Sequence, residues 1–266
     1  MKIDRRKFLK LAGCTGIGLG LSATDMFKGT VEASSGHSAV STAAVRHAMV
    51  IDVRKLQTAE DYQRIVDACN KIHNIPTLIP EKGNPKHEVK WIWNDTYGHS
   101  FPDQQNYYHP EAFKQKLFPL LCNHCDHPPC VRVCPTKATF KRPDGIVQQD
   151  MHRCIGCRFC MAACPYGSRS FNFVDPRPFI KDKNPEYPTR TMGVVEKCTF
   201  CSERLEKGEQ PACAEASNGA LVFGNLNDPE SEVRKILKSN FSLQRKPELG
   251  TMPSVFYVIG GGEYAG

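Results

Sequence analysis

The sequence lacks the features of several common protein classes. Its 266 residues contain no P-loop, no nucleophile elbow and no zinc-protease helix, so the usual motifs for nucleotide binding and hydrolysis are missing. From Ser34 onward no apolar run approaches the roughly 20 residues that a membrane-spanning helix needs. No block of Lys and Arg with interleaved aromatic residues indicates a nucleic-acid partner.

The N-terminal segment has the features of an export signal. Arg5 and Arg6 form a twin-arginine pair, which precedes a Gly-rich apolar run and a small-residue cleavage site. We therefore expect residues 1–33 to be a twin-arginine signal peptide, with the processed chain starting near Ser34. An uncleaved anchor or a lipid on Cys14 is the alternative. The twin-arginine route carries proteins that fold and take up cofactors before export, so we expect a periplasmic protein.

Cysteine is abundant, with 13 residues, and its spacing is regular. The first motif reads C-x2-C-x4-C-x3-C-P, the second C-x2-C-x2-C-x3-C-P and the third C-x2-C-x11-C. The second pattern is typical of bacterial iron–sulfur proteins, in which three thiolates bind one cluster and the fourth binds a neighbouring cluster. In chain order the motifs contain Cys122, Cys125, Cys130 and Cys134, then Cys154, Cys157, Cys160 and Cys164, then Cys198, Cys201 and Cys213.

Three other uses of cysteine fit this spacing less well. Disulfides would explain the abundance of cysteine but not the two runs that end in Cys-Pro. Export in the folded state also disfavours disulfides. Zinc sites pair C-x2-C knuckles separated by about 12–20 residues, which only the third motif approaches. A zinc-binding structural module is therefore the alternative from a different functional class. Covalent c-type haem needs C-x-x-C-H, and none of the three motifs has His after its second cysteine.

These motifs and their surroundings resemble a known family, the four-motif, ferredoxin-like electron-transfer subunits of membrane-bound redox complexes. The likeness runs over about residues 48–257 and includes the segments 120–125, 140–147 and 195–201. The resemblance implies an α+β fold of tandem bacterial-ferredoxin-like 4Fe-4S domains, loop-rich, with short strands and helices. It also implies that paired motifs hold two clusters by exchanging their last cysteines.

The chain departs from this family at the first of the family's four motifs, which precedes the three cysteine motifs described above. Only the last cysteine of that motif, Cys69, is present. Thr58 and Asp61 resemble a capping box, and apolar residues follow at helical spacing, so we expect a helix in place of the cluster loop. The family's fourth motif corresponds to the C-x2-C-x11-C motif of this chain, and Ser217 stands in place of its last cysteine. All four ligands of one cluster are therefore missing together. The three other cysteine places of the first motif hold Ala59, Tyr62 and Ile65.

The family's pairing assigns the remaining cysteines to three [4Fe-4S] clusters without a remainder. Cys69 would supply the ligand that the three-cysteine motif lacks, although a buried apolar cysteine on a helix face is the alternative. The ligands that the resemblance implies are Cys122, Cys125, Cys130 and Cys164 for cluster 1, Cys154, Cys157, Cys160 and Cys134 for cluster 2, and Cys198, Cys201, Cys213 and Cys69 for cluster 3.

The net charge depends on these clusters. The formal charge is +7, but residues 1–33 hold six of the 35 basic and three of the 28 acidic residues, which leaves 29 against 25, or +4. A four-iron cluster with four thiolates carries about −2, so three clusters would reverse the sign. The basic composition is therefore no argument for nucleic acid.

Two groups of residues have open roles. His124 and His127 flank predicted ligands, where they either tune a cluster or lie on the surface. The aromatic residues before the first motif form either a local core, which we favour, or a partner surface. They are Trp91, Trp93, Tyr97, Tyr107 and Tyr108.

The chain is expected to have four parts and short secondary-structure elements. Residues 1–33 are the signal, 34–119 a degenerate first motif with an insertion, 120–175 a two-cluster ferredoxin domain, and 176–266 a third-cluster motif with an extension that packs on 48–76. The proline-rich stretch 175–191 is expected to be an irregular loop. We expect strands at 48–53, 145–148, 170–174 and 220–223, helical turns at 129–134 and 159–164, a helix at 230–239 and an extended segment at 246–257.

The resemblance implies a subunit that relays single electrons and carries no substrate chemistry. Within the family, the three-cluster pattern with a twin-arginine leader is most similar to the periplasmic iron–sulfur subunit of the Dsr (or related Hme) transmembrane complex of sulfite and sulfate respiration. There the partners are a quinone-interacting membrane subunit, a multihaem cytochrome c and further redox subunits. The alternative is a subunit of a periplasmic molybdopterin reductase or hydrogenase. We expect partner subunits to hold the chain on the outer face of the cytoplasmic membrane.

Overall fold

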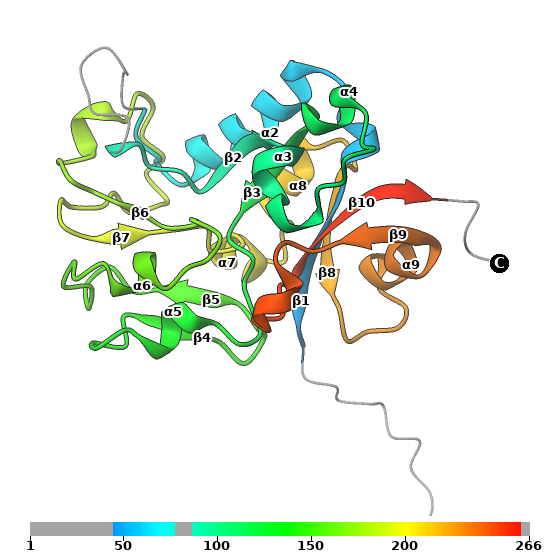
Figure 1. Ribbon diagram of the computed structural model, residues 1–266. Coiled ribbons are helices and arrows are strands. Elements are labelled where there is room, and N and C mark those ends of the chain that lie inside the picture. Colours follow the sequence, from blue (N-terminus) through cyan, green and yellow to red (C-terminus); the bar gives the residue numbers. More distant parts are fainter. Residues whose placement is uncertain (1–44, 78–86, 262–266) are drawn as a thin grey trace, which may run out of the picture. The chain divides into compact units, whose positions relative to one another are not determined.

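The computed structural model describes residues 45–77 and 87–261, and the account below concerns these ranges (Figure 1). The described residues all belong to one compact unit of the chain. The predicted signal at residues 1–33, with Arg5 and Arg6, lies outside the described residues.

The largest sheet has four strands in the order β8-β1-β10-β9. Its inner strand β1 runs parallel to β10 and antiparallel to β8. Met49 and Ile51 of β1 face the main core, whereas Ala48 and Val50 face a second core beneath a helix, so the strand is apolar on both faces. The sheet thus joins the two ends of the described unit. Its strands are β1 (His47–Asp52), β8 (Leu221–Asn225), β9 (Asn240–Leu243) and β10 (Val255–Gly261).

Three two-stranded antiparallel sheets accompany the larger one. In Figure 1 the strands β4 to β7 gather on one side of the unit, away from the four-stranded sheet. The pairs are β2 (Ile92–Thr96) with β3 (Leu117–Leu121), β4 (Thr139–Lys141) with β5 (Val147–Gln149), and β6 (Ser170–Phe171) with β7 (Val195–Glu196).

The helices are short, apart from α2 and α9. Thr58 caps α2 and exchanges hydrogen bonds with Asp61, which confirms the predicted capping box. Within the described ranges no helix has both the length and the apolar character that crossing a membrane requires. The helices are α2 (Ala59–Ile72), α3 (Tyr97–Ser100), α4 (Glu111–Lys114), α5 (Pro129–Arg132), α6 (Phe159–Ala162), α7 (Ser202–Leu205), α8 (Ala212–Ala216) and α9 (Glu232–Ser239).

Most local predictions agree with this loop-rich α+β fold, which is confirmed, but some are wrong. The strand predicted at 170–174 ends at Phe171, and the predicted extended segment at 246–257 is mainly a 3-10 turn and loop before β10 begins at Val255. Lys246 and Gly250 have positive φ angles of 48° and 64°, which are incompatible with a strand.

The aromatic residues before the first complete motif divide into two groups. Trp91 and Tyr97 are buried in the main core, as we favoured. Tyr107 and Tyr108 are 90% and 86% exposed, so the core interpretation is wrong for them. They lie in a turn just before α4, where the backbone leaves the paired strands.

Candidate metal centres

The twelve cysteines of the described ranges all have free thiols, and they gather in three sets. We call them sets A, B and C. Set A comprises Cys122, Cys125, Cys130 and Cys164; set B comprises Cys134, Cys154, Cys157 and Cys160; and set C comprises Cys69, Cys198, Cys201 and Cys213.

Each C-x2-C loop contains a residue with left-handed backbone just before its second cysteine. The φ angles are 41° at His124, 70° at Gly156 and 53° at Phe200. A positive φ turns the chain sharply, which lets two thiols three residues apart face a common centre. At Gly156 a side chain is also excluded sterically, because a Cβ atom would lie 2.4 Å from the carbonyl oxygen of Gly193. The same local geometry is thus built three times from different residues.

The third cysteine of each motif lies in a one-turn helix. Cys130 is in α5, Cys160 in α6 and Cys213 in α8. Pro follows the last cysteine of the first two motifs and stops the helix there. The remaining cysteine, Cys69, lies in the last turn of α2, which packs against α8.

Set A has two buried cysteines, Cys125 and Cys130, and two half-buried ones, and its thiols influence one another. Burial and then the neighbouring Cys122 raise the pKa of Cys125 to about 12, and Cys130 and Cys164 contribute in the same direction. Burial and Cys122 also raise the pKa of Cys164. The first motif therefore meets the last cysteine of the second one in space.

Set B lines one narrow pocket at the surface. All four of its cysteines border this pocket, and Cys157 is exposed. Backbone N–H groups of Thr139 and Val195 donate to the sulfurs of Cys134 and Cys154, each at 3.4 Å. Burial by itself would raise the pKa of Cys134, but the hydrogen bonds from Thr139 and Thr136 outweigh it and lower that pKa. These bonds favour the thiolate of Cys134, whereas burial raises the pKa of Cys160 in the same set.

Set C is buried throughout, and Cys69, Cys198 and Cys213 are part of the main hydrophobic core. Burial raises the pKa of Cys69 well above its ordinary value, and the charges of Cys198, Cys213 and Cys201 raise it further. The N–H of Phe200 donates to the sulfur of Cys198 at 3.4 Å. The structure thus brings Cys69 to the cysteines of the third motif, 129 or more positions along the chain.

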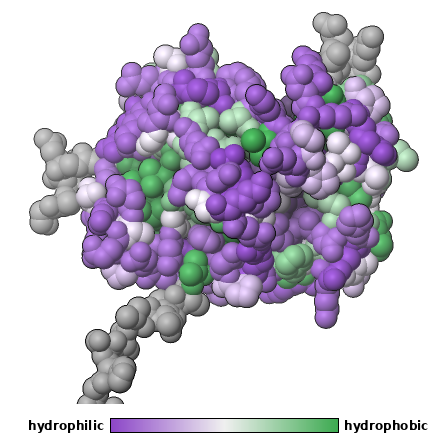
Figure 2. All heavy atoms as spheres, turned by 180° about the vertical axis from the view of Figure 1, so that it is seen from behind, coloured by the Kyte–Doolittle hydropathy of each residue, from purple (hydrophilic) through white to green (hydrophobic). Residues whose placement is uncertain are grey.

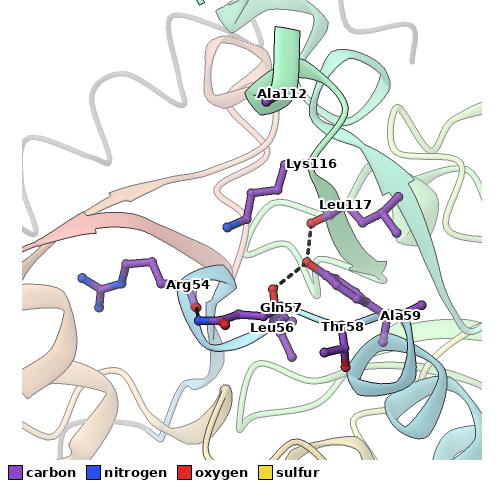
Figure 3. Close-up of a pocket in the computed structure, with 9 residues that line it drawn as sticks. Arg54, Leu56, Gln57, Thr58, Ala59, Ala112, Lys116 and Leu117 are labelled. Carbon is purple, nitrogen blue, oxygen red and sulfur yellow. Dashed lines mark hydrogen bonds between the residues drawn. The ribbon is translucent and has the colours of Figure 1, made fainter. Parts of the chain in front are cut away.

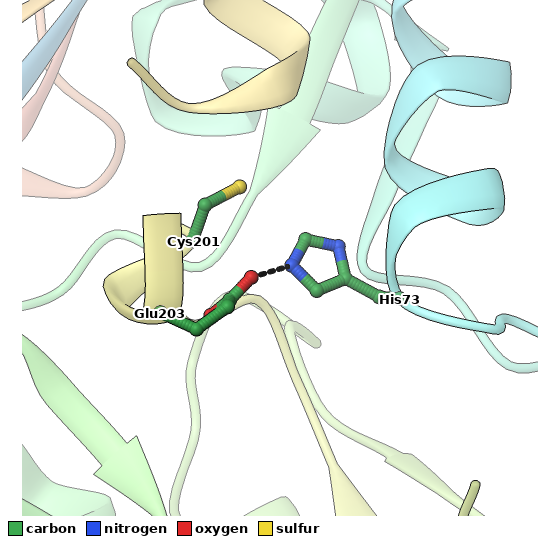
Figure 4. A group of neighbouring side chains, drawn as sticks. All are labelled: His73, Cys201 and Glu203. Atoms are coloured by element: carbon green, nitrogen blue, oxygen red, sulfur yellow. Dashed lines mark hydrogen bonds and ion pairs between the residues drawn. The ribbon is translucent and has the colours of Figure 1, made fainter. Parts of the chain in front are cut away.

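A histidine and a glutamate border set C that the sequence did not single out. His73 Nε2 lies 2.8 Å from a carboxylate oxygen of Glu203, and Nδ1 lies 3.6 Å from the sulfur of Cys69. Ligand atoms of His73, Glu203 and Cys201 lie within 4.8 Å of one another (Figure 4). Burial by itself would raise the pKa of Glu203, but the bond from His73 outweighs it and lowers that pKa. The helical spacing of His73 from Cys69 was the available signal.

Polar atoms around the sets fit an iron–sulfur group chemically. Thiolates are the ligands that iron–sulfur clusters use, and sulfur also accepts hydrogen bonds from nearby donors. In the described part of the chain, several buried donors beside the cysteines have no hydrogen-bond partner within the protein. They are Asn123 Nδ2, His124 Nε2, Gln149 Nε2, Arg169 Nη2 and Thr199 Oγ1.

Two buried cations near the sets have no carboxylate partner among the described residues. Lys197 is fully buried, and its Nζ donates to the carbonyl oxygens of Val147 and Cys198. Arg169 donates to Gln149 Oε1 at 3.0 Å and to Thr139 Oγ1 at 3.2 Å. A buried charge without a counter-charge costs several kcal/mol, so these cations fit a site that holds anionic clusters.

Arg169 lies between sets A and B. Burial by itself would lower its pKa, but the negative charges of Cys130, Cys160 and Cys122 outweigh it and raise that pKa. By contrast, the buried Arg190 has its own carboxylate, Glu196, at 2.8 Å. Arg169 differs from Arg190 in having no such carboxylate within the described ranges.

The positions at which the family pattern has a fourth set of cysteines are occupied by helix α2 and by hydrogen-bonded side chains. Ser217 Oγ donates to the Ala214 carbonyl at 2.6 Å and accepts from the Leu221 N–H at 2.9 Å. The hydroxyl of Tyr62 lies 2.9 Å from the Leu117 carbonyl oxygen. A pocket of about 570 Å³ opens where α2 begins (Figure 3), but it has no cysteine in its lining. Its lining residues are Arg54, Leu56, Gln57, Thr58, Ala59, Tyr62, Ala112, Lys116 and Leu117.

The two histidines beside set A differ in their surroundings. His124 is 1% exposed and stacks on Phe200 with ring centroids 3.7 Å apart, so a surface role is wrong for it. The N–H of Val147 donates to Nδ1 of His124 at 3.1 Å, which places the imidazole proton on Nε2. His127 is exposed, as the surface interpretation predicts.

Known proteins similar to this chain point to the same chemistry. The family model of a 4Fe-4S dicluster domain matches residues 113–175. The Hdr-like menaquinol oxidoreductase iron-sulfur subunit 1 of Archaeoglobus fulgidus is 45% identical over 98% of this chain and all of the relative. The menaquinone reductase iron-sulfur cluster-binding subunit of Nitratidesulfovibrio vulgaris is 36% identical over 80% of this chain and 89% of the relative.

A partial relative extends the comparison to a different kind of enzyme. One subunit of the tetrathionate reductase of Salmonella typhimurium is 46% identical over 53% of this chain and 51% of the relative. The full-length relatives, the matched dicluster model and the grouped cysteines all describe one kind of protein. This chain belongs to the family of ferredoxin-like iron–sulfur electron-transfer subunits that bind 4Fe-4S clusters.

Proposed function

We propose that the chain relays single electrons through three [4Fe-4S] clusters, one in each cysteine set. The observation that carries this proposal is the division of all twelve described cysteines into three groups of four. When bound, such a cluster takes up and gives back one electron without a change in its ligands. The protein's residues hold the thiolates, exclude water from sets A and C, and place cations beside them.

We propose that the relay runs in the order B, A, C. Arg169 lies beside cysteines of both A and B, and helices α5 and α6 contact each other. Set A is also close to set C, because Cys122 contributes to the raised pKa of Cys198 after burial. The stacked rings of His124 and Phe200 join the C-x2-C loops of the same two sets. Set A is thus the middle station, and B and C are the ends.

We propose that the electrons are exchanged with a quinone-interacting membrane subunit. The names of two relatives refer to menaquinol oxidation and menaquinone reduction, which supports this partner. The resemblance seen in the sequence further supports a multihaem cytochrome c and other redox subunits in sulfite or sulfate respiration. The relative from a tetrathionate reductase favours, as the second candidate, a subunit of a molybdopterin reductase.

We also propose that the chain works on the outer face of the cytoplasmic membrane, held there by partner subunits. The twin arginines Arg5 and Arg6 support export. Replacement of both by Lys should leave a cofactor-loaded precursor in the cytoplasm. In cells without the membrane partner, the processed protein should become soluble in the periplasm. Retention on the membrane without any partner would instead identify an anchor in residues 1–33.

Iron and sulfide analysis of the purified chain tests the number of clusters. Three four-iron clusters predict about twelve iron and twelve sulfide per chain. Sixteen irons would contradict the proposed ligand sets, and a colourless zinc protein would show the structural alternative to be correct. Turnover of a substrate by the purified chain without partners would contradict a pure relay.

A further inference from the structure

Large apolar side chains surround set B at the protein surface. Ile155, Phe159 and Met192 are 66%, 60% and 63% exposed. Ile155 and Phe159 flank the exposed Cys157, whereas Met192 comes from a distant segment. The close approach of Gly156 to the Gly193 carbonyl brings that segment against the motif loop. We call these three side chains with Cys157 the set B face.

The other two C-x2-C loops do not present apolar residues in this way. The position after the first cysteine holds Asn123 in set A and Thr199 in set C, and both are buried. In set B the same position holds the exposed Ile155. On one side of the molecule, hydrophobic residues form groups among hydrophilic ones (Figure 2). The set B face combines exposed apolar surface with a predicted cluster site, a combination typical of an interaction surface.

The rim of the set B face is basic. Arg132 and Lys137 are exposed on either side of Cys134, and Arg158 directly follows Cys157. The Arg158 guanidinium lies 5.4 Å from the centre of the Phe171 ring. In the described part of the chain none of these three cations forms an ion pair with Asp or Glu. A fourth, Arg153, pairs with Asp150 at 3.1 Å.

We propose that the set B face docks a redox protein with an acidic surface, and that electrons enter or leave the relay there. This inference rests on the proposed function, because it requires a cluster in set B. Basic and acidic surfaces attract each other before contact and speed up association. The apolar centre excludes water after contact, directly over the exposed cysteine. A second copy of this chain would bring like charges together, so it is a poorer occupant.

Electron transfer to two cytochromes of opposite charge tests the docking surface. The holoprotein, reduced with dithionite and freed of excess reductant, is mixed with either an acidic c-type cytochrome or basic horse-heart cytochrome c. Each transfer oxidises one cluster by one electron and reduces one ferric haem to ferrous, with no bond made or broken. The second-order rate is measured by stopped flow at low and at high salt.

Charge reversal on the face should affect the two cytochromes in opposite directions. In the double variant Lys137→Glu, Arg158→Glu, we expect the rate with the acidic cytochrome at low salt to fall about tenfold or more, and that with the basic cytochrome to rise. The matched control is Lys235→Glu, Lys238→Glu on α9, which changes the net charge equally. Both lysines are exposed, and this control should alter either rate less than about twofold.

Met192→Gln tests the apolar part separately, because this residue lies outside the cysteine motifs. We expect a several-fold lower rate with the acidic cytochrome at high salt, where charge attraction is screened. Iron content and electron paramagnetic resonance (EPR) spectra should match the wild type in all variants.

Several outcomes would overturn the proposed docking surface. One is an equal change of the electron-transfer rates in the face double variant and in the control double variant on α9. Another is loss of self-association, or loss of binding to anionic phospholipid vesicles, specific to the face variant, because these would show a second copy or a membrane as the occupant. If the wild type has its full iron content but no face variant changes either electron-transfer rate, the docking surface alone is overturned. A wild-type protein that lacks a cluster in set B would overturn the proposed function, and this inference with it.

Discussion

Sets B and C use the same C-x2-C loop with a left-handed third residue, but they lie in opposite surroundings. Set C is enclosed by the main core, and burial raises the pKa of Cys213 to about 11. Set B lies at the surface, with Cys157 exposed and the pKa of Cys134 lowered by hydrogen bonds. The loop geometry therefore suits both sets to a metal cluster, whereas burial decides whether the set contributes mainly to stability or is accessible to a partner.

The difference has consequences for both folding and electron exchange. Set C joins α2, the third motif and α8, so metal bound there would connect distant parts of the chain and contribute to folding. Set B is completed within residues 134–160 and presents its cluster site to solvent. We expect set C to act mainly on stability and set B mainly on exchange with partners.

The largest expected effect on stability comes from replacing one cysteine in set C and comparing it with one replaced in set B. Cys198→Ala should remove the set C cluster and leave the buried Lys197 without a compensating charge, at a cost of about 3–5 kcal/mol. Cys157→Ala should release one cluster with a much smaller loss of stability, because its site is already at the surface. Anaerobic urea unfolding, followed by circular dichroism, measures both. Equal destabilisation would contradict the difference between the sets.

Cys69→Ser sharpens the comparison by testing how set C is completed. We expect the set C cluster to be weakened or converted, because a buried hydroxyl is a poor replacement for a thiolate, while the other two clusters remain. Iron analysis and EPR spectroscopy follow the change. If iron content and all signals stay as in the wild type, Cys69 is only a core residue and another ligand completes set C.

Arg169 allows the electrostatics of sets A and B to be separated from those of set C. Arg169→Met should lower the reduction potentials of the clusters in A and B, because the reduced, more negative cluster loses a nearby cation. A loss of about 1.4 kcal/mol of attraction corresponds to about 60 mV for one electron. Arg169→Lys keeps the charge and should shift them less. Redox titration followed by EPR checks this, and a shift confined to set C would contradict it.

The smallest effect is expected at the missing cluster. Ser217→Cys should not add iron, since one thiolate cannot replace four ligands. It should cost about 1 kcal/mol, because the thiol is a weaker partner for the Leu221 N–H and the Ala214 carbonyl than the hydroxyl is. Thermal unfolding and iron analysis measure both values. Four additional irons per chain would show that the degenerate site still accepts a cluster.

Much of the local structure could be predicted because it depends on neighbouring residues. The capping box of α2 needs only Thr58 and Asp61, and the helical turns around Cys130 and Cys160 follow from short motifs that end in Cys-Pro. The strands β2, β3, β4, β7 and β9 were missed, since each is short and depends on a partner elsewhere in the chain. The 3-10 turn at Pro247–Leu249 was missed because no local signal revealed the positive φ of Lys246.

The sequence by itself determined the chemistry of this protein: which thiols are present, how they are spaced, and which positions of the family pattern lack a cysteine. Those features depend on residue type and on loops of a few residues. Only the tertiary structure decided that Cys157 is exposed while Cys69 is buried, and that His73 meets Glu203. It also decided that Arg169 and Lys197 lie beside the cysteines with no carboxylate partner among the described residues. Burial and pairing depend on segments that are far apart in the chain, so they arise only when the whole chain packs.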